Sequence, residues 1–149
     1  MTKEWGPPTW LFFHTFAEKI DEDLYRKHAP YILDMVKQLC SALPCPTCQT
    51  HATQYMRKIH VRQVLTKEQF KQMLWTFHNT VNRRLNKKIF TQQELDIYKR
   101  ANFPLILNHF QYQMKRNWTL NRSFNEQLFR RRVTSRFVNF VLNHRTQFQ

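Results

Sequence analysis

Residues 70–85, FKQMLWTFHNTVNRRL, carry the clearest structural signal in the chain. Apolar side chains recur there at i, i+3, i+4 and i+7 spacing, namely Phe70, Met73, Leu74, Phe77, Val81 and Leu85. This spacing predicts an amphipathic helix with one face toward a core. The 149 residues include a single glycine, Gly6, whereas tightly turned sheets and phosphate-binding loops need several. The chain is therefore predicted to be all-α, with a compact bundle of four or five helices.

The other helices of this bundle follow from the same spacing and from the positions of proline. One is predicted near residues 8–20, after two prolines that are typical of a helix start. Others are predicted from about Pro30 to Leu43, where the next residue is a proline that ends the helix, and from Cys45 onward. A shorter helix is predicted from near Thr91, because a glutamate three residues later fits a capping box.

The segment 104–149 differs from the rest of the chain in composition. It holds eight Lys and Arg residues but one acidic residue, Glu126. One more amphipathic helix is predicted from its apolar residues Phe124, Leu128, Phe137, Phe140 and Val141. The chain is therefore divided into a domain at 1–103 and a basic helical C-terminal extension at 104–149. The run Arg130–Arg132 suits a water-facing surface or the docking of nucleic acid or an acidic partner, and the first is the commoner role of such a run.

The overall composition limits the class of protein. The formal net charge of +14 indicates a polyanion or an anionic cofactor among the partners, although an inert basic surface has the same charge. The N-terminal MTKEWGPPTW lacks the apolar centre of a signal peptide, and no apolar run approaches the roughly 20 residues of a membrane span. The protein is therefore expected to stay in a reducing compartment, where a close cysteine pair is more often catalytic or metal-bound than structural.

Such a pair occurs at residues 43–52, LPCPTCQTHA. Cys45 follows a proline at a predicted helix start, where the partial positive charge favours a thiolate, and Cys48 lies three residues later on the same face. The two thiols are thus close enough for a reversible disulfide. Zinc is the first alternative, with His51 and His60 as further ligands, but these histidines are too far apart in sequence for a Cys2His2 finger. A thioredoxin-like site is the second alternative, but its fold requires strands that this sequence does not predict.

Polar residues also occupy the helix at 70–85 and the residues just after it. His78 and Asn82 lie one turn apart beside apolar neighbours, and Asn79 and Lys87 are close in sequence. A polar group on a core-facing side destabilises the fold unless it has a partner. A bound ligand with a flat polar ring and a diphosphate would supply such partners, and hydrogen bonds across the bundle are the alternative.

Three segments in this order resemble the Erv/ALR family of FAD-linked sulfhydryl oxidases. They are WGPPTWLFFHTFA at 5–17, LPCPTCQTHA at 43–52 and FHNTVNRRLNK at 77–87. The LPCPTC form and the HNTVNRRLNKKI run are especially similar to members encoded by large cytoplasmic DNA viruses. The resemblance covers about residues 5–100. It implies a helical bundle that holds FAD without a covalent bond, with the CxxC disulfide against the flavin ring.

The resemblance also implies roles for individual residues. Cys45 would be the thiol that a substrate attacks, and Cys48 the thiol next to the flavin. The residues implied to bind FAD are Gly6, Trp10, His14, His78, Asn79, Val81, Asn82, Lys87 and Tyr98. Many members carry a second CxxC, which one chain cannot form here because Cys40 is its remaining cysteine, expected to be a buried free thiol. Leu43 and Thr76 replace a tyrosine and a histidine that some members have.

The implied activity is that of a flavin-linked thiol oxidase. A substrate thiolate would attack Cys45, Cys48 would pass two electrons to FAD, and O2 would take them to give H2O2. The implied substrates are thioredoxin-like or other CxxC proteins of a virus, and the family's usual homodimer implies a second copy of the chain. The expected location is the host cytoplasm, a viral factory or the virion. An alternative from another class is a basic helical binding protein whose CxxC is structural or binds zinc.

Overall fold

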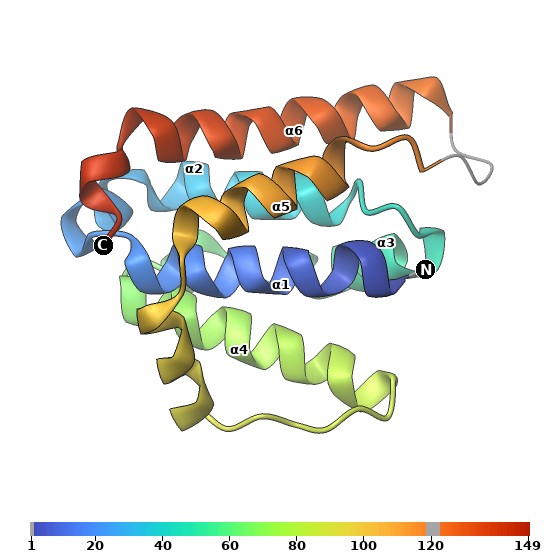
Figure 1. Ribbon diagram of the computed structural model, residues 1–149. Coiled ribbons are helices and arrows are strands. Elements are labelled where there is room, and N and C mark those ends of the chain that lie inside the picture. Colours follow the sequence, from blue (N-terminus) through green and yellow to red (C-terminus); the bar gives the residue numbers. More distant parts are fainter. Residues whose placement is uncertain (1, 119–122) are drawn as a thin grey trace.

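The computed structural model describes the backbone of residues 2–118 and 123–149, and the side chains of residues 4–118 and 123–149. Its elements are, in order, α1 (Thr2–Lys19), α2 (Glu22–Cys40), α3 (Pro46–Arg57), η1 (Val61–Gln63), α4 (Lys67–Arg84), η2 (Gln93–Arg100), α5 (Phe103–Lys115), α6 (Phe124–Asn143) and η3 (Arg145–Gln147) (Figure 1). Within these ranges extended backbone pairs only at an isolated bridge between Ile20 and Phe148. The predicted all-α fold is therefore confirmed. None of the helices in these ranges combines the length and the apolarity that crossing a membrane requires.

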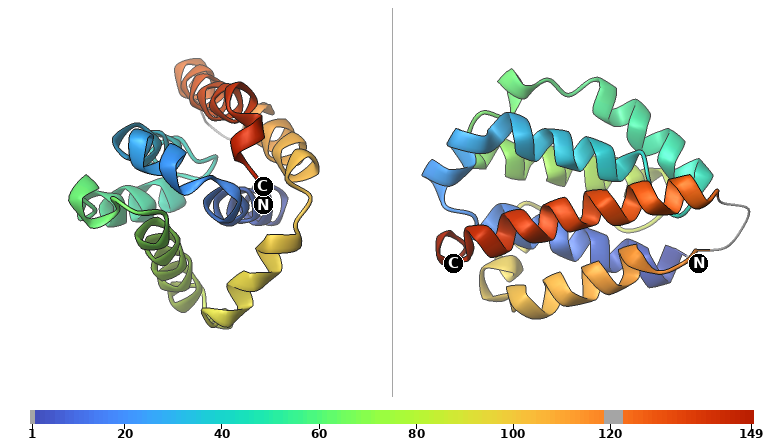
Figure 2. Two further views of the ribbon diagram at one scale, coloured as in Figure 1. Left: turned by 90° about the vertical axis from the view of Figure 1, so that its left-hand side faces the viewer. Right: turned by 90° about the horizontal axis from the view of Figure 1, so that it is seen from above.

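Helix α1 lies in the middle of the bundle, and the other helices lie around it in the end-on view of Figure 2. Its Phe12 ring stacks on Phe110 of α5, with ring centroids 4.0 Å apart, and meets Phe137 of α6 edge-on at 5.2 Å. On another side α1 contacts α4 and η2. Because α1 contacts both groups of helices, the apolar residues of 1–103 and of 104–149 form one core.

The helix starts predicted from proline differ from the structure. α1 begins at Thr2, so Pro7 and Pro8 lie inside it beyond the first turn, where each removes one backbone hydrogen bond of the helix. α2 begins at Glu22 rather than Pro30, because the Asp21 carboxylate accepts a hydrogen bond from the first turn and caps the helix. The backbone of α2 is kinked at His28 (φ −118°, ψ 15°), so a second helical segment begins next to Pro30, close to the start that the sequence predicts.

The link between α2 and α3 brings the cysteine pair to one end of the molecule. α2 ends at Cys40 instead of the predicted Leu43, because the residue before Pro44 is disfavoured in helical backbone. Cys45 is the N-cap of α3, as the sequence predicts for the start of that helix. The carboxyl ends of α2 and α4 and the amino ends of α1 and α3 lie together at this end (Figure 1).

The helix predicted from near Thr91 is the 3-10 helix η2. Its buried side chains Leu95 and Tyr98 are three residues apart, which is the repeat of a 3-10 helix. The Thr91 hydroxyl accepts a hydrogen bond from the Glu94 N–H at 3.3 Å, which is one half of the predicted capping box.

The segment 104–149 contributes the α-helices α5 and α6 and the short η3 where one helix was predicted, and its residues 119–122 lie outside the described residues. The additional α-helix is α5, which the Asn102 side chain caps by accepting a hydrogen bond from the Leu105 N–H at 3.2 Å. In α6, the predicted apolar residues Phe137, Phe140 and Val141 are buried.

Two other expectations for α6 were wrong. Phe124, placed in the apolar stripe by its spacing, is 74% exposed at the first turn, beyond the reach of the core. The arginine run does not face water as a unit, since Arg130 is buried, Arg131 is half-buried and Arg132 is exposed. Consecutive residues on a helix point about 100° apart, so a run of three necessarily spans several directions.

Candidate active site

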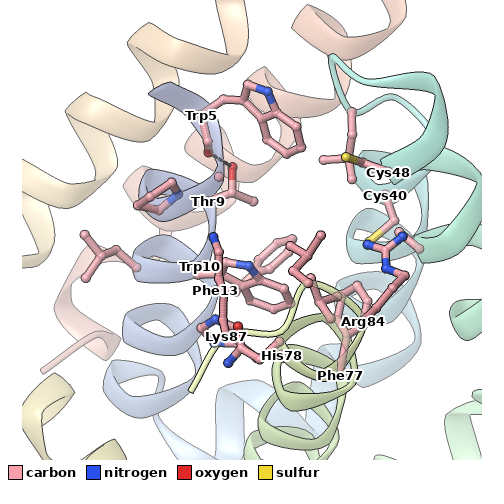
Figure 3. Close-up of a pocket in the computed structure, with 18 of the residues that line it drawn as sticks. Trp5, Thr9, Trp10, Phe13, Cys40, Cys48, Phe77, His78, Arg84 and Lys87 are labelled. Atoms are coloured by element: carbon pink, nitrogen blue, oxygen red, sulfur yellow. Dashed lines mark hydrogen bonds between the residues drawn. The ribbon is translucent and has the colours of Figure 1, made fainter. Parts of the chain in front are cut away.

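A cavity of about 350 Å³ lies at the end of the bundle that carries the cysteine pair. Its wall is built by α1, α3, α4, η2, the end of α2 and the segments that follow α2 and α4. Trp5, Thr9 and Trp10 of α1 lie on one side, and Cys48 of α3 lies across from them (Figure 3). The described residues that line the cavity include aromatic rings and the cations Arg84 and Lys87, but no Asp or Glu. Such a lining favours a flat ligand that carries negative charge.

The two thiols of the CxxC segment occupy different surroundings. Cys45 has extended backbone and caps α3, with its sulfur accepting a hydrogen bond from the Cys48 N–H at 3.2 Å. Cys48 lines the cavity, whereas Cys45 is not among the lining residues. Both side chains are half-buried, and both thiols are free. The pair therefore has one thiol at the cavity and one outside its lining.

The electrostatic surroundings of Cys48 have two opposing parts. Burial, followed by the hydrogen bond and charge of Cys45, raises the pKa of the Cys48 thiol to about 12. The guanidinium of Arg84 opposes this effect and lowers the pKa of Cys48. Cys40 also borders the cavity, but burial raises the pKa of its thiol to about 12 and only 1% of the residue is exposed. Cys40 is thus a buried free thiol, in agreement with the sequence-based expectation.

A series of stacked rings forms the opposite part of the site. Trp10 lies parallel to His78, with ring centroids 4.0 Å apart and planes at 5°. His78 bonds to His14, with Nδ1 and Nε2 2.9 Å apart, and Tyr98 stacks on His14 at 5.0 Å. The hydrogen bond across the bundle is therefore between two histidines of different helices, rather than between His78 and Asn82.

Both histidines are uncharged at neutral pH. Burial, with a smaller contribution from His78, lowers the pKa of His14 to about 3. Burial, with a smaller contribution from Lys87, lowers the pKa of His78 to about 4. Since one nitrogen of each ring is used in their mutual hydrogen bond, His78 keeps its Nε2 for a polar partner at the cavity.

The end of α4 places Lys87 at the cavity. Asn86 adopts a positive φ of 56°, a conformation that asparagine tolerates, and the Lys87 N–H then bonds to the Asn82 carbonyl at 2.8 Å. Asn79 holds the following segment, donating to the Phe90 carbonyl at 2.9 Å and accepting from its N–H at 3.1 Å. Asn79 therefore fixes the segment that carries Lys87 without lining the cavity itself.

The structure gathers most of the residues that the resemblance assigns to FAD. Those that line the cavity are Gly6, Trp10, His78, Val81, Asn82, Lys87 and Tyr98, whereas His14 and Asn79 lie behind it. Sequence reasoning missed Arg84, although it lies within the FHNTVNRRLNK segment, and the aromatic residues Trp5, Phe13 and Phe77 of the wall. Leu85, predicted to face the core, is 46% exposed because it is the residue that ends α4.

These residues fit FAD, because the site offers aromatic rings, uncharged polar groups and cations without a competing carboxylate. Among the described residues, no three His, Cys, Asp or Glu side chains lie close enough together to bind a metal ion. His51 and His60, the histidines considered for zinc, are both exposed.

Known proteins match the same part of the chain. Residues 7–101 match the model of the Erv1 / Alr family. Over 108 residues the chain is 32% identical to an FAD-linked sulfhydryl oxidase of African swine fever virus, covering 72% of this chain and 87% of that protein. It is 34% identical over 97 residues to the FAD-linked sulfhydryl oxidase ERV1 of Arabidopsis thaliana, covering 64% and 50% of the two chains. For the putative FAD-linked sulfhydryl oxidase 347L of Invertebrate iridescent virus 6, the identity is 32% and the coverage 59% and 85%. No solved structure matches the chain.

Proposed function

Because the chain belongs to the Erv1 / Alr family, we propose that it is an FAD-dependent thiol oxidase whose redox-active pair is Cys45 and Cys48. The observation that carries the proposal is the unequal position of the two thiols. Cys48 lines the cavity, whereas Cys45 caps α3 outside the lining. This asymmetry supports Cys45 as the thiol that meets the substrate and Cys48 as the thiol that meets the cofactor.

The chemistry of the pair is thiol–disulfide exchange. A substrate thiolate attacks the Cys45 sulfur of the Cys45–Cys48 disulfide, a bond forms between substrate and Cys45, and Cys48 leaves as a thiolate. A second substrate thiolate then attacks the substrate sulfur of this mixed disulfide and releases Cys45. The substrate gains a disulfide, and its two electrons remain on the pair as a dithiol. Arg84 favours the departure of Cys48, because its charge lowers the pKa of that thiol.

The residues that would hold FAD come from α1, α4 and η2. Trp10 and His78 offer a flat surface and a polar nitrogen, and Lys87 offers a cation for the diphosphate. Gly6, Val81, Asn82 and Tyr98 complete the wall, with His14 and Asn79 supporting it from behind. The chemistry that FAD supplies when bound is acceptance of two electrons from the dithiol and their transfer to O2, which is reduced to H2O2.

The proposal includes partners and a location. The substrates are thiol-containing proteins, of the thioredoxin-like or CxxC class, and the chain acts as a homodimer. The viral relatives support a protein that works in the host cytoplasm or viral factories and contributes to virion disulfides.

The test is oxygen consumption with dithiothreitol as substrate. Cys45→Ser and Cys48→Ser are expected to lose turnover while they keep FAD, because either change leaves no pair to exchange disulfides. Cys40→Ser is the matched control, since it removes a thiol of the same cavity wall, and it is expected to keep most of the activity. Loss of turnover in folded Cys40→Ser equal to that of Cys45→Ser would contradict the assignment.

A further inference from the structure

We infer that Arg130, in the C-terminal helix α6, is a positioning residue for the loop that carries Cys45. The inference rests on the proposed function of Cys45 and Cys48 as the redox pair. Arg130 lies outside the residues 7–101 that match the family. The inference therefore gives a role in the reaction to a part of the chain that the family match does not cover.

The contacts of Arg130 join three segments. Its Nε donates to the Met114 carbonyl at 3.0 Å, and its Nη2 donates to the Arg116 carbonyl at 3.2 Å, both at the end of α5. Its Nη1 donates to the Ala42 carbonyl at 3.4 Å, in the link between α2 and α3. The side chain is fully buried, with 1% of the residue exposed. Arg130 thus connects α6 with the link, across 88 positions of sequence.

These acceptors explain why a cation is stable at this depth. The last carbonyl groups of a helix have no partner within the helix and carry the negative end of its dipole. Ala42 follows the end of α2, and Met114 and Arg116 lie at the end of α5. The planar guanidinium reaches carbonyls of both helix ends at once, which a lysine cannot do because its donors radiate from one nitrogen.

The next carbonyl of the loop is held by a side chain as well. The Leu43 carbonyl accepts a hydrogen bond from Gln49 Nε2 at 2.7 Å, and Pro44 has no N–H to donate. The two carbonyls before the proline are therefore held by side chains, one from α6 and one from α3. Because Cys45 comes directly after this proline, the same hydrogen bonds set the position of its sulfur relative to Cys48.

The neighbouring Arg131 is a suitable comparison, because its hydrogen bonds hold α6 to the end of α5. Its guanidinium bonds to the Lys115 carbonyl at 2.9 Å and to Asn117 Oδ1 at 2.8 Å. Both arginines therefore fasten α6 to the end of α5, but the hydrogen bond to the CxxC loop is made by Arg130. A comparison of the two separates the positioning of Cys45 from the stability of the helix pair.

The experiment measures the equilibrium between the dithiol and the disulfide of Cys45 and Cys48. The full chain, carrying Cys40→Ser and loaded with FAD, is equilibrated without oxygen in mixtures of reduced and oxidised dithiothreitol. The mixture is then quenched and alkylated, and mass spectrometry measures the fractions of dithiol and disulfide. Arg130→Met and Arg130→Lys are expected to shift this equilibrium toward the dithiol by about tenfold, because a loosened loop lowers the effective concentration of one thiol at the other. Arg131→Met is expected to leave the equilibrium unchanged.

A second variant protects the test against misfolding. Gln49→Leu releases the neighbouring Leu43 carbonyl without touching α6, and it is expected to shift the equilibrium in the same direction as Arg130→Lys. An equilibrium in Arg130→Lys and Gln49→Leu equal to that of Arg131→Met would overturn the inference. If instead the parent chain forms no Cys45–Cys48 disulfide and oxidises no dithiothreitol, the proposed function itself fails.

Discussion

His14 of α1, which is buried, and His78 of α4, which is half-buried, form a hydrogen-bonded pair with Nε2 and Nδ1 2.9 Å apart. Burial is the main reason that both pKa values lie below the ordinary 6.5, at about 3 and about 4. The pair is therefore neutral wherever the protein is folded near neutral pH. A neutral pair gives the cavity polar atoms without adding positive charge to that of Lys87.

This pair makes the stability of the protein depend on pH. Between 6.5 and about 4 each histidine binds a proton in the unfolded state but not in the folded state. The free energy of unfolding therefore has its highest value above pH 6.5. As the pH decreases from 6.5 to about 4, it falls by about 1.4 kcal/mol per pH unit for each histidine. His14→Phe, which keeps an aromatic ring, is expected to flatten this slope in urea unfolding of the FAD-free protein. His51→Phe on the exposed side of α3 is the control, and an equal slope in His14→Phe and wild type would contradict the prediction.

Arg84 is the residue expected to tune the reactivity of Cys48. Burial and Cys45 raise the pKa of this thiol, and Arg84 is the cation that opposes them. Arg84→Gln should therefore raise the pKa of Cys48 further, so that the pH profile of dithiothreitol oxidation moves to higher pH and turnover near neutral pH falls severalfold. Arg83→Gln removes the same charge one residue away, where the side chain does not line the cavity, and should leave the profile in place. A profile that moves equally in both variants would show that only net charge matters.

At the scale of elements, α6 contains one phenylalanine that stabilises the core and another that does not contact it. Phe137 is fully buried against Phe12, whereas Phe124 is 74% exposed. Phe137→Ala is expected to lower the free energy of unfolding by about 3–5 kcal/mol, because it leaves a cavity in the core. Phe124→Ala should change it by about 0.5 kcal/mol or less. Denaturant unfolding measures both, and equal losses would mean that α6 packs differently.

The helices were predictable from sequence where spacing and capping agree. Phe70, Met73, Leu74 and Phe77 are all buried in α4, because a long periodic stripe has only one way to face a core. α5 was missed although its buried residues have helical spacing, because Pro104 was taken as a boundary rather than as a proline in the first turn. The prediction that Phe124 is buried was wrong, because spacing indicates which face of a helix is apolar but not how far the neighbouring helices extend along it.

At the scale of the whole molecule, α1 connects the cavity with the C-terminal helices. Its Trp10 stacks on His78 at the cavity, and its Phe12 stacks on Phe110 in α5. The apolar residues on both sides of the division at residue 103 belong to one core. The division into a domain and an extension stays a prediction, since it concerns independent folding rather than contact.

The candidate site was predictable to the extent that its residues lie in short motifs. Cys48 and His78 belong to segments whose spacing and family resemblance are enough to indicate a redox site. The contact of Arg130 with the Ala42 carbonyl was not predictable, because it joins positions 88 residues apart and leaves no periodic signal. The arginine run in the sequence predicted only positive charge. The burial of Arg130 depends on how α6 packs against α2 and α5.

The most direct measurement is the visible absorption spectrum of the purified protein, followed during an oxygen-free titration with dithiothreitol. The protein is expected to be yellow, and dithiothreitol should bleach the flavin bands in wild type and in Cys40→Ser, since both retain the Cys45–Cys48 pair. In Cys45→Ser and Cys48→Ser the bands should remain during the same titration, because the pair no longer carries electrons from the thiol to FAD. A colourless protein, or bleaching as fast in Cys48→Ser as in wild type, would contradict a flavin-linked oxidase that works through Cys45 and Cys48.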